Sequence, residues 1–447
     1  MSRRAASVAL PVFVAAVGGA ALLQGGFYLR QIAPLTLLAG IGATVAIGRR
    51  VRPVRALGIA AGLLGLGIAA SGVVNGWPAG SAKTVLTLVF SLACFVLADR
   101  ARAADGEDAV VEAISAIGVL VAAIGLISLA FHLERFTVPA DTWRLASTLT
   151  YQNAAGSLFM LTMPMAAALV VRRSTPLRRA SLAVQLAALP ATLSRGALVG
   201  AIVAIVVLLL ARALPWRELA QPAAGAALIL AGAVPAILDR GPYEISGVAG
   251  LLAGSALAAA TLSGRTARVL PYAVSIALVA GVAVAPFTAL SGRLTLSTTD
   301  RARVWQQTIA DVTDPWFGSG PGTYLLRGSF DGLPTRTTFA HNEYLQTYVE
   351  TGAVGLVCAL AALLLVARTV WRARRRDPIW AAAAAALAAF VVHSAFDFLW
   401  RIPALTGIAF ALVALAVGRS VAPGSASEDA SAQTLRDDEA VADGQDR

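Results

Sequence analysis

Apolar runs of near-spanning length follow one another almost end to end along this chain of 447 residues. Because the hydrocarbon core of a bilayer is about 30 Å thick, a helix needs roughly 20 apolar residues to cross it. The alternating polarity of a membrane β-barrel is absent, so helices are the predicted spanning elements. We predict fourteen spans, and a twelve-helix version with one pair re-entrant or merged stays open. The predicted spans lie near residues 5–23, 31–48, 54–75, 81–98, 108–131, 153–172, 177–193, 195–213, 219–238, 244–263, 268–290, 348–367, 378–396 and 400–418.

Composition supports this interpretation. Hydrophobic residues make up 57% of the chain and charged residues 14%, whereas soluble globular proteins carry roughly 25% charged residues. We therefore predict an all-α integral membrane protein with about 12–14 transmembrane helices. The two cysteines, Cys94 and Cys358, lie inside apolar runs. They are expected to be packed as small hydrophobic side chains, without a disulfide framework or a metal site.

The net charge of +11 would fit a nucleic-acid-binding protein, but its distribution along the chain does not. With the N-terminus inside, the inner segments before the C-terminal tail hold 21 basic residues and the short outer loops hold 7. Such an excess on one side is the positive-inside pattern of membrane proteins. It predicts that both termini lie in the cytoplasm and that the chain has no nucleic-acid partner. The Ala-, Arg- and Gly-rich composition suggests a bacterial genome, so we expect a protein of the bacterial cytoplasmic membrane.

Two segments lack the apolar pattern. Residues 291–347 contain Trp, Tyr, Phe and Gly and are predicted to form a long, helical extracytoplasmic loop. Long ordered loops in compact proteins are usually functional. Residues 419–447 are rich in Ser, Ala, Asp and Glu and are predicted to be a disordered cytoplasmic tail. The predicted organisation is therefore eleven spans in 1–290, a catalytic loop in 291–347, three spans in 348–418, and the tail.

The outer segment is predicted to form a helix, a turn and a second helix. Asp300 can cap a helix over about 301–312, in which Arg301 and Trp305 share one face. The string Gly318-Ser319-Gly320-Pro321-Gly322 follows. Without a preceding strand it is no dinucleotide fingerprint. It is either a plain tight turn or a turn whose backbone amides face a phosphate or a sugar.

The chain has three histidines, His132, His341 and His393. None pairs with another at i+3 or i+4, which excludes a zinc-binding helix motif. His341 would lie just above the membrane surface, and imidazole is the side chain best suited to accept a proton near neutral pH. His341 is therefore a candidate general base. His132 and His393 lie near span ends and are expected to be satisfied interfacial residues.

Arginines at the outer span ends supply the second candidate chemistry. Arg195 begins a span, Arg144 precedes Tyr151-Gln152-Asn153, and Arg401 begins the last span. A guanidinium binds a diphosphate well because its planar fork donates two parallel hydrogen bonds. Each could instead be an interfacial arginine that reaches lipid headgroups. Asp397 lies near a membrane boundary, where an acid is costly unless paired, and Arg401 at i+4 is its simplest partner.

Three strings occur in order and on the predicted outer side. They are Leu193-Ser194-Arg195-Gly196-Ala197; Arg301-x-x-x-Trp305 followed by Asp314-Pro315-Trp316-Phe317-Gly318-Ser319-Gly320-Pro321-Gly322; and Ala340-His341-Asn342-Glu343-Tyr344-Leu345-Gln346 with Glu350-Thr351-Gly352. Together they resemble the O-antigen ligase and O-antigen polymerase superfamily of polytopic membrane glycosyltransferases. The resemblance is dense from about 185 to 403, while the first 130 residues match only in hydropathy.

This resemblance implies a GT-C-like fold of about twelve spans, fewer than the fourteen predicted. It also implies transfer of a glycan from a polyprenyl-diphosphate carrier to a glycan, lipid or protein acceptor at the outer face, without metal or other cofactor. His341 matches the general base, and Arg195 and Arg301 match the diphosphate-binding arginines. Further candidates for substrate binding are Arg303, Arg144, Trp305, Asn342 and Tyr344, and candidates for supporting the site are Asn153, Gly320, Asp397 and Arg401.

The residues fit an inverting transfer, in which a base accepts the acceptor proton and cations hold the leaving diphosphate. Two alternatives stay open. A polymerase would extend the glycan on its lipid carrier, and the sequence does not separate it from a ligase. A transporter of lipid-linked glycans would favour charged or broken segments near the midplane and internal repeats. No repeat is found, and the polar candidates lie at the outer boundary.

Overall fold

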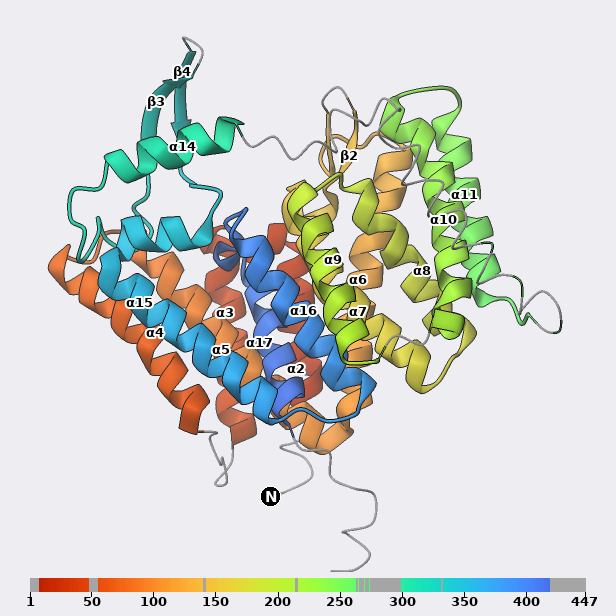
Figure 1. Ribbon diagram of the computed structural model, residues 1–447, viewed down its shortest axis with the longest axis horizontal. Coiled ribbons are helices and arrows are strands. Elements are labelled where there is room, and N and C mark those ends of the chain that lie inside the picture. Colours follow the sequence, from red (N-terminus) through yellow and green to blue (C-terminus); the bar gives the residue numbers. More distant parts are fainter. Residues whose placement is uncertain are drawn as a thin grey trace, which may run out of the picture. The chain divides into compact units, whose positions relative to one another are not determined.

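The computed structural model describes residues 8–47, 55–139, 142–213, 216–262, 299–330 and 333–418, and Figure 1 shows their helices and strands. The α-helices are α2 (Ala9–Leu22), α3 (Leu29–Ile47), α4 (Arg55–Val74), α5 (Ser81–Asp105), α6 (Glu107–Ala130), α7 (Gln152–Arg172), α8 (Pro176–Ala191), α9 (Arg195–Leu210), α10 (Trp216–Leu238), α11 (Tyr243–Ala259), α14 (Thr299–Ala310), α15 (Glu343–Arg372), α16 (Pro378–Ser394) and α17 (Pro403–Val417). Short 3₁₀ turns are η1 (Gln24–Gly26), η2 (Ser147–Leu149) and η4 (Leu399–Arg401), and the strands are β1 (Thr137–Val138), β2 (Arg144–Leu145), β3 (Leu326–Phe330) and β4 (Leu333–Thr337).

The predicted all-α architecture is confirmed. Every predicted span except 268–290 coincides with a helix, and that span lies outside the described residues, as does the predicted tail 419–447. Helices α8 and α9 are separate, with Ser194 between them as the N-cap of α9. The sequence therefore predicted correctly that residues 177–193 and 195–213 form two separate helices, although the boundary between them is only weakly marked.

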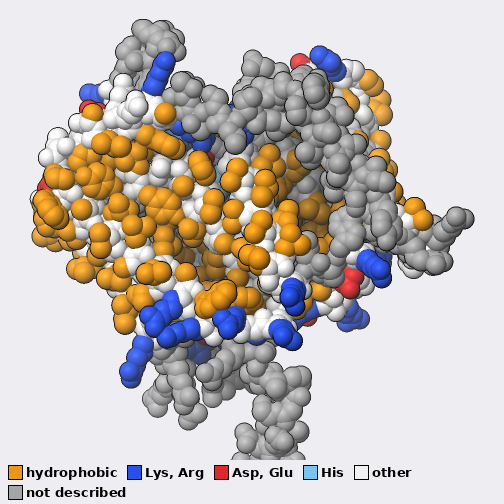
Figure 2. All heavy atoms as spheres, in the orientation of Figure 1, with side chains coloured by type: hydrophobic (Ala, Val, Ile, Leu, Met, Phe, Trp, Pro, Cys, Tyr) orange, Lys and Arg blue, Asp and Glu red, His pale blue; other side chains and the backbone are white. Residues whose placement is uncertain are grey.

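Within the described residues, seven helices are long and apolar enough to cross a membrane, and five shorter helices are also apolar. Their outward positions carry large apolar side chains, such as Leu364, which is 71% exposed, and Leu37, which is 65% exposed. Figure 2 shows an apolar band across the visible face, with Lys and Arg side chains gathered along its lower edge. A band of this kind needs lipid rather than water around it. The protein is therefore a multi-pass membrane protein.

The helices pack closely through small residues. Helices α10 and α11 touch at Gly232 and Gly250, where a Cβ atom added to Gly232 would lie 2.7 Å from the Cα atom of Gly250. Helices α4 and α15 touch at Gly67 and Gly355, where an added Cβ would lie 3.0 Å from the neighbouring Cα. Such small-residue contacts are typical of helix packing in lipid, where close backbone approach supplies van der Waals contact.

The outer segment differs from the predicted helix, turn and helix. Helix α14 ends at Ala310, and an antiparallel hairpin of β3 and β4 stands between it and α15, with Phe330 opposite Leu333. Helix α15 begins at Glu343, ahead of the predicted span, and breaks at Gly352, whose φ is 67°. The break separates a short first part of α15 from the long apolar helix that follows it.

Candidate active site

The site is built on a carboxylate–imidazole pair from two loops. Asp397 lies between α16 and η4, and its side chain is fully buried. His341 directly precedes α15, and its Nδ1 lies 3.3 Å from Oδ1 of Asp397. The backbone of His341 has a left-handed φ of 50°, a conformation that costs a non-glycine residue about 1 kcal/mol or more. The surrounding contacts therefore hold His341 in a strained position beside Asp397.

Three further donors converge on the Asp397 carboxylate. The Tyr151 hydroxyl donates to Oδ2 at 2.7 Å, the Asn153 amide donates to Oδ2 at 2.5 Å, and the backbone N–H of Phe398 donates to Oδ1 at 2.9 Å. Burial alone would raise the pKa of Asp397, but the hydrogen bonds and charges, led by His341, hold it below the usual range. Asp397 is therefore a carboxylate near neutral pH. Asn153, a predicted support residue, belongs to this cluster.

Tyr151 was not singled out from the sequence, although it begins the string that contains Asn153. Burial first, and then the neighbouring Asp397 charge, raise the pKa of Tyr151 well above its usual value. Tyr151 therefore stays protonated and acts as a hydrogen-bond donor to the carboxylate. Its ring also stacks on Phe398 at 5.2 Å between centroids, which fixes its orientation.

This arrangement sets the chemistry of His341. Because the Asp397 carboxylate is a hydrogen-bond acceptor, Nδ1 of His341 donates to it, which leaves Nε2 as the ring nitrogen that can meet a bound molecule. The His341 side chain is 32% exposed, so a substrate can reach it. His393, in contrast, is 1% exposed, with its Nδ1 2.9 Å from the Ser157 hydroxyl. Of these two imidazoles, His341 is the one placed to exchange a proton with a bound molecule.

Helix α14 is fastened to both loops of the pair. Arg301 Nη1 donates to the carbonyl of Phe396, next to Asp397, at 2.6 Å. Trp305 Nε1 donates to the carbonyl of Ala340, next to His341, at 2.8 Å. Among the residues that the structure describes, Arg301 forms no ion pair with a carboxylate. Its positive charge is therefore available to an anion bound beside His341.

Arg195 is the next arginine candidate and lies at the start of α9. Arg195 is the exposed first residue of α9, and the helix is capped by the Ser194 hydroxyl, which accepts from the Ala197 N–H at 3.3 Å. The neighbouring Gly196 lies against His393, where an added Cβ would come within 2.4 Å of the ring. The chain thereby holds Arg195 next to the helices that form the site.

Arg303 is exposed on α14, on the helix that carries Arg301. Arg144 lies in β2, opposite Val138 of β1, and this short hairpin contacts α6 and α8. Their contribution to substrate binding stays a prediction.

Asp397 does not pair with Arg401, so the simplest partner suggested by the i+4 spacing was wrong. The 3₁₀ turn η4 directs Arg401 away toward α15, where it pairs with Glu343 at 2.9 Å and with Glu350 at 2.8 Å. Burial opposes the charge of Arg401, but the two carboxylates outweigh it and raise its pKa. Arg401 therefore supports the site by joining η4 to the first part of α15.

The glycine-rich string is a tight turn whose amides are occupied. The amides of Gly318, Ser319 and Gly320 donate to the carbonyls of Asp314, Val349 and Glu350, and the amide of Gly322 donates to the Glu350 carboxylate at 2.6 Å. An added Cβ at Gly320 would lie 2.6 Å from Cγ of Pro78. Since these four amides already have partners, the plain turn holds and the phosphate-facing alternative does not.

Asn342 and Tyr344 have structural contacts of their own. Asn342 caps α15, because its side-chain oxygen accepts from the Leu345 N–H at 3.1 Å. The Tyr344 hydroxyl donates to the carbonyl of Val391 in α16 at 2.8 Å, and its ring meets Trp400 edge to face. Both residues fix the start of α15 behind His341, and their predicted contact with substrate stays a prediction.

These features define a multi-pass helical membrane protein. It carries the imidazole–carboxylate pair of His341 and Asp397, and Arg301 lies in the first turn of α14 beside that pair. Residues 180–360, which are less than half of the chain, match the family model of the O-antigen ligases, and this match supports the resemblance to the O-antigen ligase superfamily. The matched range includes Arg195, Arg301 and His341 but not Asp397. No curated protein matches the chain. The family implies glycan transfer at a membrane.

Proposed function

We propose that the protein transfers a glycan from a polyprenyl-diphosphate carrier to an acceptor hydroxyl at the outer face of the bacterial cytoplasmic membrane. In this proposal the fold is GT-C-like, both termini are cytoplasmic, and residues 291–347 form the extracytoplasmic catalytic loop. The excess of arginine on the opposite side of the predicted spans supports this orientation. The single observation that carries the proposal is the pairing of partly exposed His341 with the buried Asp397 carboxylate.

The proposed reaction inverts the configuration of the transferred sugar. Nε2 of His341 accepts the proton of the acceptor hydroxyl while the acceptor oxygen forms a bond to the anomeric carbon. The bond between that carbon and the diphosphate oxygen breaks from the opposite side, and the diphosphate leaves with the electron pair. A base of this kind contributes roughly 10²–10⁴-fold to the rate.

Arginines hold the leaving diphosphate in this proposal. Arg301 is fixed at one nitrogen by the carbonyl of Phe396, and its remaining donors can serve a phosphate. Arg195 is exposed and lies beside the same helices, with Arg303 and Arg144 as further cations. Because guanidinium groups supply the positive charge, the reaction needs no divalent metal or other cofactor.

Asp397 is proposed as a positioning residue. It holds the tautomer of His341 and stabilises the imidazolium that forms, as in other carboxylate–histidine pairs. The aromatic rings around it form an apolar wall, with Phe398 stacked on Phe339 at 3.9 Å and in edge contact with His341 at 5.3 Å. Such a wall excludes water, which would otherwise compete with the acceptor for the glycan.

The proposal is tested by substituting His341→Ala and Arg195→Ala in cells that depend on this chain for surface glycan. Both variants should abolish glycan transfer while protein levels in the membrane stay normal. Gln306→Ala, an exposed change on α14, is the matched control and should leave transfer intact. Normal glycan length and attachment in both site variants would contradict the mechanism. Whether the product stays lipid-bound distinguishes a polymerase from a ligase.

A further inference from the structure

A cavity lies at the far end of α14 from the site. Its volume is about 130 Å³, and it is open to the outside between α14, the loop 311–325 and the first part of α15. Since a water molecule takes up about 30 Å³ in the liquid, the cavity has room for roughly four waters, so it can admit the hydroxyl-bearing edge of one sugar ring whose other edge stays outside. Neither His341 nor Asp397 lines it, so it is separate from the site described above.

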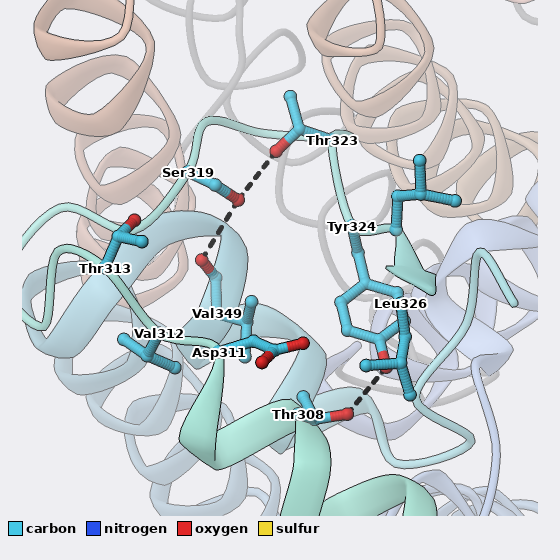
Figure 3. A pocket seen from close by; sticks show the side chains of 10 residues that line it. Thr308, Asp311, Val312, Thr313, Ser319, Thr323, Tyr324, Leu326 and Val349 are labelled. Carbon is cyan, nitrogen blue, oxygen red and sulfur yellow. Dashed lines mark hydrogen bonds between the residues drawn. The ribbon is translucent and has the colours of Figure 1, made fainter. Parts of the chain in front are cut away.

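The walls of this cavity carry hydroxyl groups, shown in Figure 3. Four of them form two pairs, with the Thr308 and Tyr324 oxygens 2.6 Å apart and the Ser319 and Thr323 oxygens 2.8 Å apart. Each hydroxyl both donates and accepts, so a pair can open to receive a ligand hydroxyl without leaving a buried group unsatisfied. Thr308 and Tyr324 are 1% and 6% exposed, so they form the buried floor of the cavity.

One carboxylate completes the wall. Asp311 follows the last turn of α14 and is exposed, and Figure 3 shows its carboxylate among the hydroxyl-bearing residues. The Asp311 charge also lies close enough to Tyr324 to contribute to the raised pKa of that phenol, after the larger effect of burial. A carboxylate can accept from two neighbouring hydroxyls at once, and apolar Val349 and Leu326 on the same wall can face sugar C–H groups.

The position of the cavity indicates that it would contact the glycan and not the lipid carrier. Helix α14 is fastened at Arg301 and Trp305 to the two catalytic loops, and Thr308 lies one turn beyond Trp305. Ten residues separate Arg301 from Asp311, which corresponds to about 15 Å along a helix. A glycan chain that runs from the diphosphate along α14 would therefore reach the cavity a few sugars from the reacting carbon.

We propose that this cavity is a glycan subsite, which binds one sugar residue of the donor or acceptor chain remote from the bond that is formed. The proposal rests on the proposed transferase function and extends it to substrate selection. A subsite of this kind makes the enzyme prefer chains long enough to reach it. It acts on affinity for the glycan, not on the proton transfer at His341.

The test compares short and long substrates in the full-length protein in proteoliposomes. Asp311→Ala removes the carboxylate at an exposed position, and Thr313→Trp places a bulky side chain at the rim of the cavity. Gln306→Ala, exposed on the same helix and absent from the cavity, is the control. Donor length is varied at a fixed acceptor, and acceptor length is then varied at a fixed donor, which shows whose sugar the subsite holds.

Asp311→Ala should raise KM for the longer chain about tenfold or more, the loss expected for hydrogen bonds to a charged group. Thr313→Trp should raise the same KM because its side chain blocks entry of the sugar. KM for a substrate with a single sugar, and kcat, should stay within about twofold of the control. A KM that rises equally for single-sugar and longer substrates, or for none, overturns the subsite.

A binding measurement separates this proposal from the proposed function. The probe is the oligosaccharide released from the lipid carrier, which lacks the diphosphate, and NMR saturation transfer reports its contact with the purified protein. The wild type should bind it and Asp311→Ala should bind about tenfold more weakly. Equal binding by both overturns the subsite whatever the transfer assay shows. If the wild-type protein transfers no glycan from any lipid carrier, that result contradicts the proposed function instead.

Discussion

Replacing Asp397 by asparagine should disable His341 while leaving the shape of the site almost unchanged. The carboxylate accepts from His341, Tyr151, Asn153 and the Phe398 amide. An asparagine that keeps its oxygen toward His341 places its amide group against the donors of Tyr151 and Asn153. The opposite orientation presents a donor to Nδ1 of His341, which moves the hydrogen to Nε2 and removes the base.

The size of the effect follows from the role of the base. Loss of the correct tautomer forfeits the contribution of general base catalysis, roughly 10²–10⁴-fold in kcat, equivalent to about 3–5 kcal/mol in the barrier. KM for the lipid-linked donor should change little, because the arginines are untouched. Tyr151→Phe is the matched control, since it removes one donor to the carboxylate but leaves the pair with His341 intact, and its kcat should fall less than tenfold.

Stability provides the second measurement of the same variant. The pKa of Asp397 is lowered in the folded protein, so the ionised carboxylate contributes stability above its unfolded pKa of about 3.9. That contribution is lost as the pH falls through the folded value. The difference in melting temperature between wild type and Asp397→Asn should therefore narrow below about pH 4. A variant that is fully folded at neutral pH and transfers within threefold of the wild-type rate would refute the reasoning.

Three further predictions concern the neighbourhood of the site. Gly196→Ala should lower the stability in detergent by about 1–3 kcal/mol, since its Cβ would overlap the ring of His393, whereas Gly58→Ala, where the added Cβ meets nothing, should not. Arg401→Met should cost about 3–5 kcal/mol, because two buried carboxylates lose their cation; an unchanged melting temperature would mean that the ion pairs contribute nothing. Chelation of divalent cations should leave the transfer rate unchanged, and a loss restored by Mg²⁺ would show that the arginines do not suffice.

Much of this architecture can be read from the sequence because lipid imposes long apolar runs. The separation of α8 from α9, for example, follows from Ser194 and the charge of Arg195 between two apolar stretches. The hairpin of β3 and β4 was missed, although Asp331-Gly332 between two short strands is a strong hairpin signal. The first turns of α15, before Gly352, correspond to the second helix predicted for the outer segment, although their polar residues were not counted as part of the span.

The candidate site was predictable in its residue types but not in its pairings. His341 was chosen for its chemistry and Arg301 for its match to the family motif, and the structure brings both to the loops around Asp397. The partner of Asp397 was chosen wrongly, since spacing along one helix suggested Arg401, while η4 turns the chain between them. Tyr151 gave no separate signal, because its role depends on a contact with a residue 246 positions away.

The most direct test of the account is the single-turnover rate of His341→Ala in proteoliposomes that contain a purified polyprenyl-diphosphate glycan and an acceptor. The account predicts that the variant binds the donor as the wild type does but forms product at least about 100-fold more slowly. Product formation at the wild-type rate, with released polyprenyl diphosphate in equal amount, would contradict it.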